Sequence, residues 1–252
     1  MKFYKHALLV ISSLSLLTLS NATTAGMVNA EFDSFGDLPR ATFGGDGISN
    51  DAVAFSSFTA SNGDVLTLGL SATRRFQNSA LGNNGAGRFF AEAGANDGVP
   101  GQPGTRATWN FSIFAEIADV NGIVGAGTET LESLDVRLFY DLDAAFGTDE
   151  SDLGFIEISV FDALKGGTGS LFEESQNSTF EYLGQDNLGF NTAPTMTSFN
   201  PNEGGEYSFL LSSNLGRVAI NVEVAEVSAP ANAAIFLIGI VGLGALRLRK
   251  TK

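Results

Sequence analysis

The sequence predicts an all-β protein, a β-sandwich of jelly-roll type, and three observations lead to that class. Runs of alternating apolar and polar residues recur along the middle of the chain, and a period of two turns one set toward a core and the other toward water. Glycine-containing turn dipeptides separate these runs, in a chain with 30 glycines. No long 3.6-residue period appears between the two ends, so no long helix is expected there.

The alternation locates the strands. The clearest runs lie at 66–70, 109–117, 134–140, 207–211 and 218–224, with shorter runs at 156–160 and 180–182. The glycine-rich stretch 82–104 is expected to be a long loop that holds one short strand around Phe89 and Phe90. These strands and turns fit one domain over residues 31–226, which is long enough to bury a core.

The charge of this domain limits its partners. All 28 acidic residues lie between Glu31 and Glu226, and only eight basic residues share that interval, so its formal charge is −20. A surface this acidic repels nucleic acid and anionic lipid, and nucleic acid is therefore not expected as a partner.

Several kinds of catalysis are excluded by composition. The chain has no cysteine, and its single histidine is His6, ahead of the domain. Thiol chemistry, Ser-His-Asp chemistry and the usual zinc sites therefore cannot occur in the domain. A glycosidase needs two carboxylates placed about a sugar, and the sequence offers no means of choosing such a pair. We expect a protein that is not an enzyme.

Residues 1–22 have the layout of a secretory signal peptide. Lys2 and Lys5 precede an apolar run at 7–19, and Ser20-Asn21-Ala22 supplies small residues before the cut. The alternative is a retained membrane anchor, although a span needs about 20 residues. Val28-Asn29-Ala30 is a second candidate cleavage motif, which would move the mature start to residue 31.

Residues 227–252 form a tail of three parts. An apolar, Gly- and Ala-rich run at 231–246 is expected to be a transmembrane helix, and positive charge after it holds that end on the cytoplasmic side. The alternatives are a permanent, slightly short anchor and a buried core helix. The short motif before the helix is Val227, Ser228, Ala229 and Pro230, and the basic cluster after it contains Arg247, Arg249 and Lys250.

This tail, preceded by a signal peptide, resembles that of the PEP-CTERM proteins. The resemblance implies that an exosortase in the inner membrane recognises the tail, cuts near the proline motif and releases the protein toward the cell surface or the exopolysaccharide matrix. Ser228-Ala229-Pro230 stands where the family has Pro-Glu-Pro, so the final proline alone matches. Stretches of the middle, at 109–111 and 139–154 among others, resemble secreted domains that carry such tails; this likeness implies no activity.

A crowded acidic stretch is the candidate metal site. Carboxylates this close together repel one another, and a calcium ion, which prefers oxygen ligands, would relieve the repulsion. The spacing is not that of an EF-hand, and the alternative is a solvated acidic loop. The predicted calcium ligands are Asp141, Asp143, Asp149 and Asp152.

Aromatic residues are the candidate sugar-binding surface, because exposed rings stack on sugars. Trp109 and Tyr140 fall on alternating apolar faces, which favours core packing for both. Tyr182 and Tyr207 are the other candidates. The pair Phe89-Phe90 is expected to plug the space under the glycine-rich loop rather than form an exposed patch. Asn110 and Asn177 each begin an N-glycosylation acceptor pattern, which we interpret as coincidence.

The sequence therefore predicts an exported protein that is anchored transiently in the inner membrane and then reaches the cell surface or the extracellular matrix. Its expected role is structural or binding, in association with exopolysaccharide and biofilm. A secreted carbohydrate-active enzyme or carbohydrate-binding module is one alternative, and a permanently tethered adhesin is another.

Overall fold

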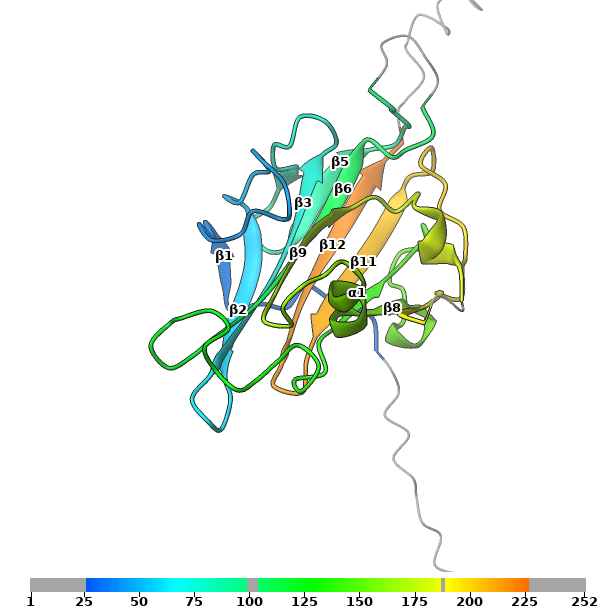
Figure 1. Cartoon of the computed structure of the whole chain (residues 1–252). Helices are drawn as coiled ribbons and strands as arrows, with labels where there is room; N and C mark the ends of the chain where they lie inside the picture. The colour runs from blue at the N-terminus through cyan, green and yellow to red at the C-terminus, as the bar shows by residue number, and fades with distance from the viewer. Residues whose placement is uncertain (1–25, 99–103, 187–188, 227–252) are drawn as a thin grey trace, which may run out of the picture.

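The computed structural model describes residues 26–98, 104–186 and 189–226, which form two β-sheets packed face to face (Figure 1). The prediction of an all-β sandwich is confirmed. The predicted signal peptide at 1–22, the motif at 227–230, the membrane helix at 231–246 and the basic cluster after it lie outside the described residues. Within those residues, no helix is long and apolar enough to cross a membrane.

The first sheet has five strands, all antiparallel. β3 and β6 pair along their whole length, from Val65 opposite Ala118 to Arg74 opposite Trp109. These two strands include the predicted runs at 66–70 and 109–117, and they form the centre of this sheet. In spatial order the strands are β1 (Ser34–Gly36), β2 (Val53–Thr59), β3 (Val65–Arg74), β6 (Trp109–Ala118) and β9 (Leu171–Gln176).

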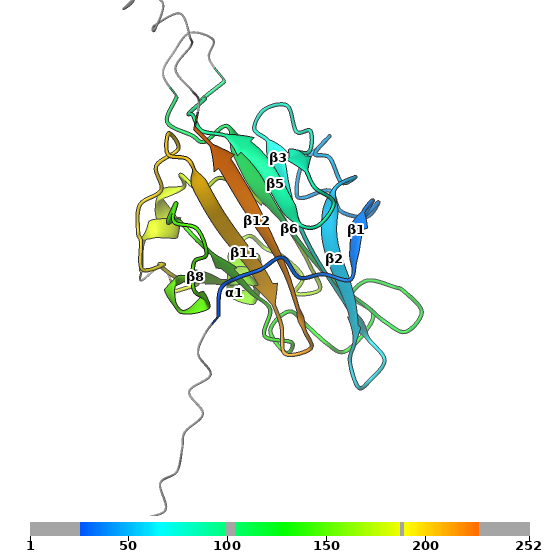
Figure 2. The same ribbon diagram turned by 180° about the vertical axis from the view of Figure 1, so that it is seen from behind.

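The second sheet has seven strands and contains the only parallel pairing among the named strands, that of β12 with β5. Turning the molecule by 180° brings β11 and β12 to the front (Figure 2). β12 lies between β11 and β5, so the last of the named strands lies inside the sheet rather than at its edge. In spatial order the strands are β10 (Asn191–Thr192), β8 (Gly154–Glu157), β7 (Arg137–Tyr140), β11 (Gly205–Ser212), β12 (Arg217–Ala225), β5 (Arg88–Glu92) and β4 (Gly82–Asn83).

The core lies between the two sheets and is rich in aromatic rings. Phe111 of β6 stacks on Phe209 of β11, with ring centroids 4.4 Å apart and planes at 27°. Trp109 and Tyr140 are 1% and 0% exposed, so the prediction that they pack in the core is confirmed. The side chains that alternate along β3, β6, β11 and β12 supply most of the rest.

Two of the shorter predicted strands are wrong. Only the start of the run at 156–160 belongs to β8, because the chain turns at Ile158 into a helix, α1 (Ile158–Leu164). Phe161 of this helix stacks on Phe190 at 4.9 Å, which closes one end of the core with aromatic surface. The run at 180–182 leads into a 3-10 helix, η2 (Glu181–Gly184).

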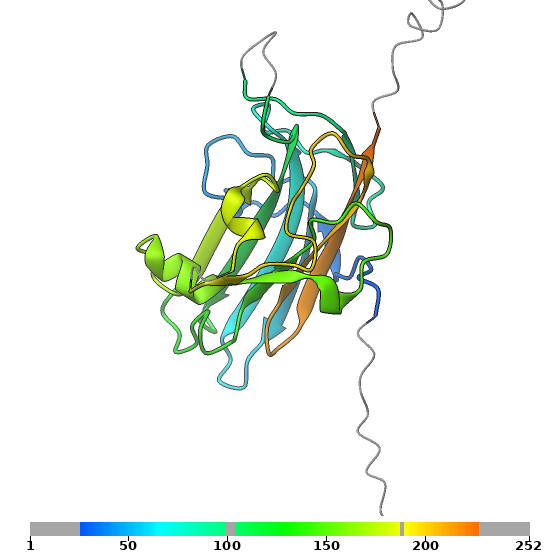
Figure 3. The ribbon, with the colours of Figure 1, turned by 90° about the vertical axis from the view of Figure 1, so that its right-hand side faces the viewer.

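The N-terminal segment is part of the sandwich. Residues 27–31 cross the outer face of the seven-stranded sheet (Figure 2). Val28 is 4% exposed and packs with Leu210 and Ala219, and the amide of Glu31 donates to the carbonyl of Ala219 at 3.0 Å. The folded unit thus includes residues 27–30, ahead of the predicted start at 31. The described chain begins and stops at opposite ends of the sandwich (Figure 3).

Candidate functional site

The predicted calcium ligands follow β7, and Asp141 is the buried member of the set. It is 1% exposed, and its Oδ1 accepts a hydrogen bond from the amide of Asp143 at 2.7 Å. Its Oδ2 has no partner among the described residues. Asp141 therefore serves the turn after β7 with one oxygen and leaves the other unsatisfied in the interior.

The other three aspartates have separate local partners. Asp143 accepts from the amide of Ala145 at 3.1 Å. Asp149 caps a 3-10 helix, η1 (Glu150–Asp152), and accepts from the amide and hydroxyl of Ser151 at 3.0 and 2.9 Å. Asp152 accepts from the hydroxyl of Thr195 at 3.1 Å. Residues 26–98, 104–186 and 189–226 contain no group of three or more acidic or histidine side chains able to hold a metal ion, so the four are not gathered as a ligand set.

The unsatisfied carboxyl of Asp141 has a consequence for stability. Burial raises the pKa of Asp141, and the hydrogen bonds of the carboxylate lower it by less. The resulting pKa is about 6. The unfolded pKa is about 3.9, so the folded state binds the proton more tightly. This group therefore stabilises the fold at low pH, and that contribution is lost as the pH rises from about 4 to about 6.

We predict that Asp141→Asn removes this pH dependence. The amide keeps an Oδ1 acceptor for Asp143, and it carries no charge to bury. The stability of the variant relative to the natural protein should rise by roughly 2 kcal/mol between pH 4.5 and pH 7.5. Urea unfolding of both proteins at the two pH values measures this difference. Asp143→Asn is the control; parallel pH profiles for Asp141→Asn and the natural protein would refute the assignment.

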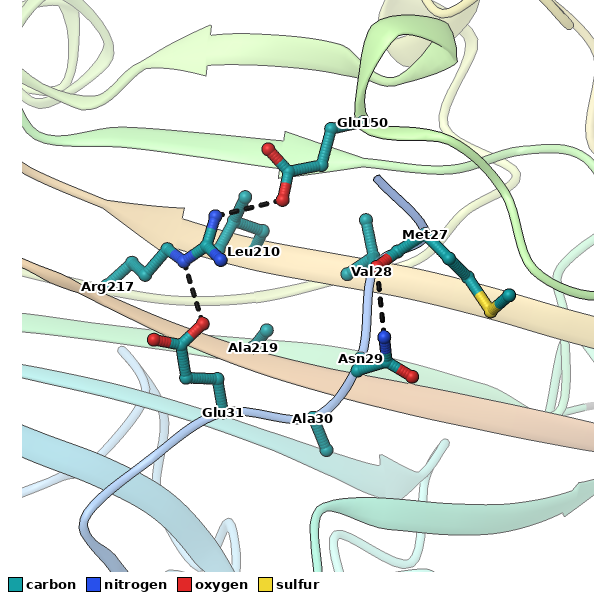
Figure 4. A pocket seen from close by; sticks show the side chains of 9 residues that line it. All are labelled: Met27, Val28, Asn29, Ala30, Glu31, Glu150, Leu210, Arg217 and Ala219. Atoms are coloured by element: carbon teal, nitrogen blue, oxygen red, sulfur yellow. Dashed lines mark hydrogen bonds and ion pairs between the residues drawn. The ribbon is translucent and has the colours of Figure 1, made fainter. Parts of the chain in front are cut away.

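The N-terminal segment is held by an arginine clamp (Figure 4). Arg217 donates through Nε to Glu31 at 2.7 Å and through Nη1 to Glu150 at 2.9 Å. Partial burial lowers the pKa of Arg217, but these bonds raise it by more, so the pKa lies above its ordinary value. The adjoining pocket is small, about 280 Å³, and its charged groups are paired with one another. We interpret it as a structural clamp.

Most of the aromatic candidates for sugar stacking are inaccessible. Trp109, Tyr140 and Tyr207 are no more than 1% exposed, and the hydroxyl of Tyr140 donates to the carbonyl of Leu183 at 2.7 Å. Tyr182 is half-buried and donates to Oε1 of Gln176 at 2.7 Å. These residues therefore build the core and its margin.

The pair Phe89-Phe90 divides between two roles. Both lie in β5, the short strand expected around them, although the stretch 82–104 also contains β4. Phe89 is 0% exposed and is the predicted plug, whereas Phe90 is 43% exposed. Alternation along the strand explains the difference, because neighbouring side chains point to opposite faces.

Asn177 is a buried bridge between strands and cannot act as a glycan acceptor. It is 0% exposed. Its Nδ2 donates to the carbonyls of Ala107 and Trp109 at 3.1 and 2.8 Å and to Oδ1 of Asn110 at 2.8 Å. Its Oδ1 accepts from the amides of Ala107 and Thr179, both at 3.2 Å. This burial agrees with the interpretation that the acceptor pattern at Asn177 is a coincidence.

A groove at one end of the sandwich was missed from the sequence. It measures about 580 Å³ and lies where the ends of β3, β5 and β12 meet the start of β6. Arg74 and Arg75 line it together with the exposed ring of Phe90. Its lining residues come from 74–82, 90–96, Thr108 and Ala225, so no local motif could have revealed it.

Comparisons of the chain with protein-family models, curated proteins and solved structures found no match.

Proposed function

We propose that this is an exported protein that reaches the cell surface or extracellular matrix through its PEP-CTERM-like tail and acts there as a binding or structural component. The observation that supports this most directly is the position of β12. This strand ends at Ala225, so all the named strands of the sandwich precede the motif at 227–230. A cut near Pro230 would release the folded domain intact. The same proposal includes the jelly-roll type of the sandwich, the N-terminal signal helix within 1–22 and the transmembrane helix at 231–246.

The signal-peptide cut belongs after Ala22 rather than after Ala30. Cleavage after Ala30 would remove Val28, which is buried against Leu210, and would cut the segment beside Glu31. The carbonyl of Val28 also accepts from Nδ2 of Asn221 at 3.3 Å. Cleavage after Ala22 keeps all of these contacts.

The test is the intact mass of the protein recovered from the medium and the cell surface, with and without an exosortase-type processing enzyme. We expect a mass that lacks residues 1–22 and the tail beyond the motif at 227–230, and only when the enzyme is present. A full-length tail in both strains would refute the sorting proposal and indicate a permanently tethered protein. A mature start at residue 31 would refute the assignment of the first cut.

A further inference from the structure

The domain contains eight basic residues, and the structure divides them into two groups. Five form ion pairs: Arg40 with Glu116, Arg88 with Glu206 and Glu223, Arg137 with Asp135 and Glu157, Lys165 with Glu174, and Arg217 with Glu31 and Glu150. The three others, Arg74, Arg75 and Arg106, form no ion pair with a described carboxylate. The undescribed segments contain no Asp or Glu, so no acidic side chain there can pair with them.

These three arginines lie at the same end of the sandwich. Arg74 is the last residue of β3 and Arg75 follows it. The amide of Arg75 donates to the carbonyl of Thr108 at 2.9 Å, two residues after Arg106. The carbonyl of Arg106 accepts from the amide of Asn96 at 2.7 Å. In a domain with a formal charge of −20, this end is therefore a local concentration of positive charge.

The charge on Arg75 is compensated only in part from within the domain. Its guanidinium lies 4.6 Å from the ring centroid of Phe76, and its Nε has no hydrogen-bond partner among the described residues. Burial lowers the pKa of Arg75, and the nearby charge of Arg106 lowers it further. Asp97 offsets this in part, but its carboxylate is occupied by the amides of Thr105 and Arg106 at 2.9 and 3.0 Å. An anion in the groove would supply the missing charge.

The remaining side chains of the groove indicate which kind of anion fits. Gln77, Asn96 and Thr108 offer amide and hydroxyl groups, and Phe90 offers an apolar ring. Glu92 is the one carboxylate among the residues that line the groove. The volume of about 580 Å³ falls in the range of small-ligand pockets. A sugar ring with a carboxylate matches these features: the guanidinium fork binds the carboxylate, the ring stacks, and the amides bind hydroxyls.

We propose that this groove binds a carboxylate-bearing sugar unit of an acidic polysaccharide, with Arg75 and Arg74 holding the carboxylate and Phe90 contacting the sugar ring. The inference rests on the proposed surface role, because only an exported protein would meet such a polymer. It gives that role a ligand class and a position: the groove adjoins Ala225, at the end of the sandwich where the described chain stops (Figure 1).

The test is a titration of the protein recovered from the cell surface with an oligogalacturonate, in which each sugar bears a carboxylate. The methyl ester of the same oligomer is the neutral control. We expect saturable binding of the acid that weakens with added salt, and no binding of the ester. Arg75→Gln should weaken binding at least tenfold, the loss expected for one charge-assisted contact. Phe90→Ala should weaken binding without changing the salt dependence.

Lys165→Gln is the matched charge control, because it removes one positive charge outside the groove and should leave the affinity within about twofold. Circular dichroism of each variant checks that it is folded. Equal affinities for Arg75→Gln and Lys165→Gln, or equal binding of acid and ester, would overturn the proposal. Binding of anionic vesicles but not of the oligomer would assign the arginines to a membrane surface instead. The intact-mass experiment does not depend on any of these results, so failure of the sorting proposal is recognised separately.

Discussion

Replacing Trp109 with alanine is expected to lower the free energy of unfolding by about 3–5 kcal/mol. The indole is 1% exposed and lies between the two sheets. Its ring centroid is 5.8 Å from that of Tyr207, 5.9 Å from that of Phe199 and 6.2 Å from that of Phe209. Truncation leaves a large cavity that these rings cannot fill, and the loss is a sizeable share of the stability of a typical domain.

This change should be followed by far-UV circular dichroism during urea unfolding, because Trp109 is the only tryptophan and its fluorescence is lost with it. Phe146→Ala is the matched control: its ring is 69% exposed, and its removal should cost less than about 0.5 kcal/mol. A loss below 1 kcal/mol for Trp109→Ala would show that the two sheets are not packed about this ring.

Replacing Asn177 with alanine is expected to cost about 2–4 kcal/mol, although it removes little apolar surface. The side chain satisfies backbone groups of Ala107 and Trp109 where no water reaches, and an unpaired buried group costs about 1–3 kcal/mol. The fluorescence of Trp109 reports this unfolding. Asn110→Ala removes a single partner of the network and should cost under about 1 kcal/mol. Equal losses for the two variants would contradict the role of Asn177 as the bridge.

The alternation of apolar and polar residues was sufficient to locate the long strands that pack on the main core. β3, β6, β11 and β12 all lie where alternation predicted them. The pattern missed β9, because residues 173–176 are all polar although this strand pairs with β6. The pattern also predicted a strand at 156–160, where α1 begins at Ile158. A seven-residue helix directly after a strand is too short to show a 3.6-residue period.

The candidate site was predicted less well than the fold, and the reason is physical. The aspartates after β7 are close in sequence, but each is used by the backbone or a hydroxyl beside it. The groove instead depends on pairings over long separations, such as Arg74 opposite Trp109 and Ala225 opposite Glu92. Which arginines are unpaired depends on where every carboxylate lies, and that follows only from the folded structure.

The position of β12 also determines when this protein can fold. β11 and β5 both need β12 as a neighbour, and the segment at 27–31 crosses β12 and bonds to Ala219. A chain that emerges from its N-terminus therefore has no completed second sheet until residue 225 has appeared. Until then β5 and β11 lack a shared partner, and Val28 lacks Ala219. Completion of the sandwich must therefore wait until its last named strand has been made.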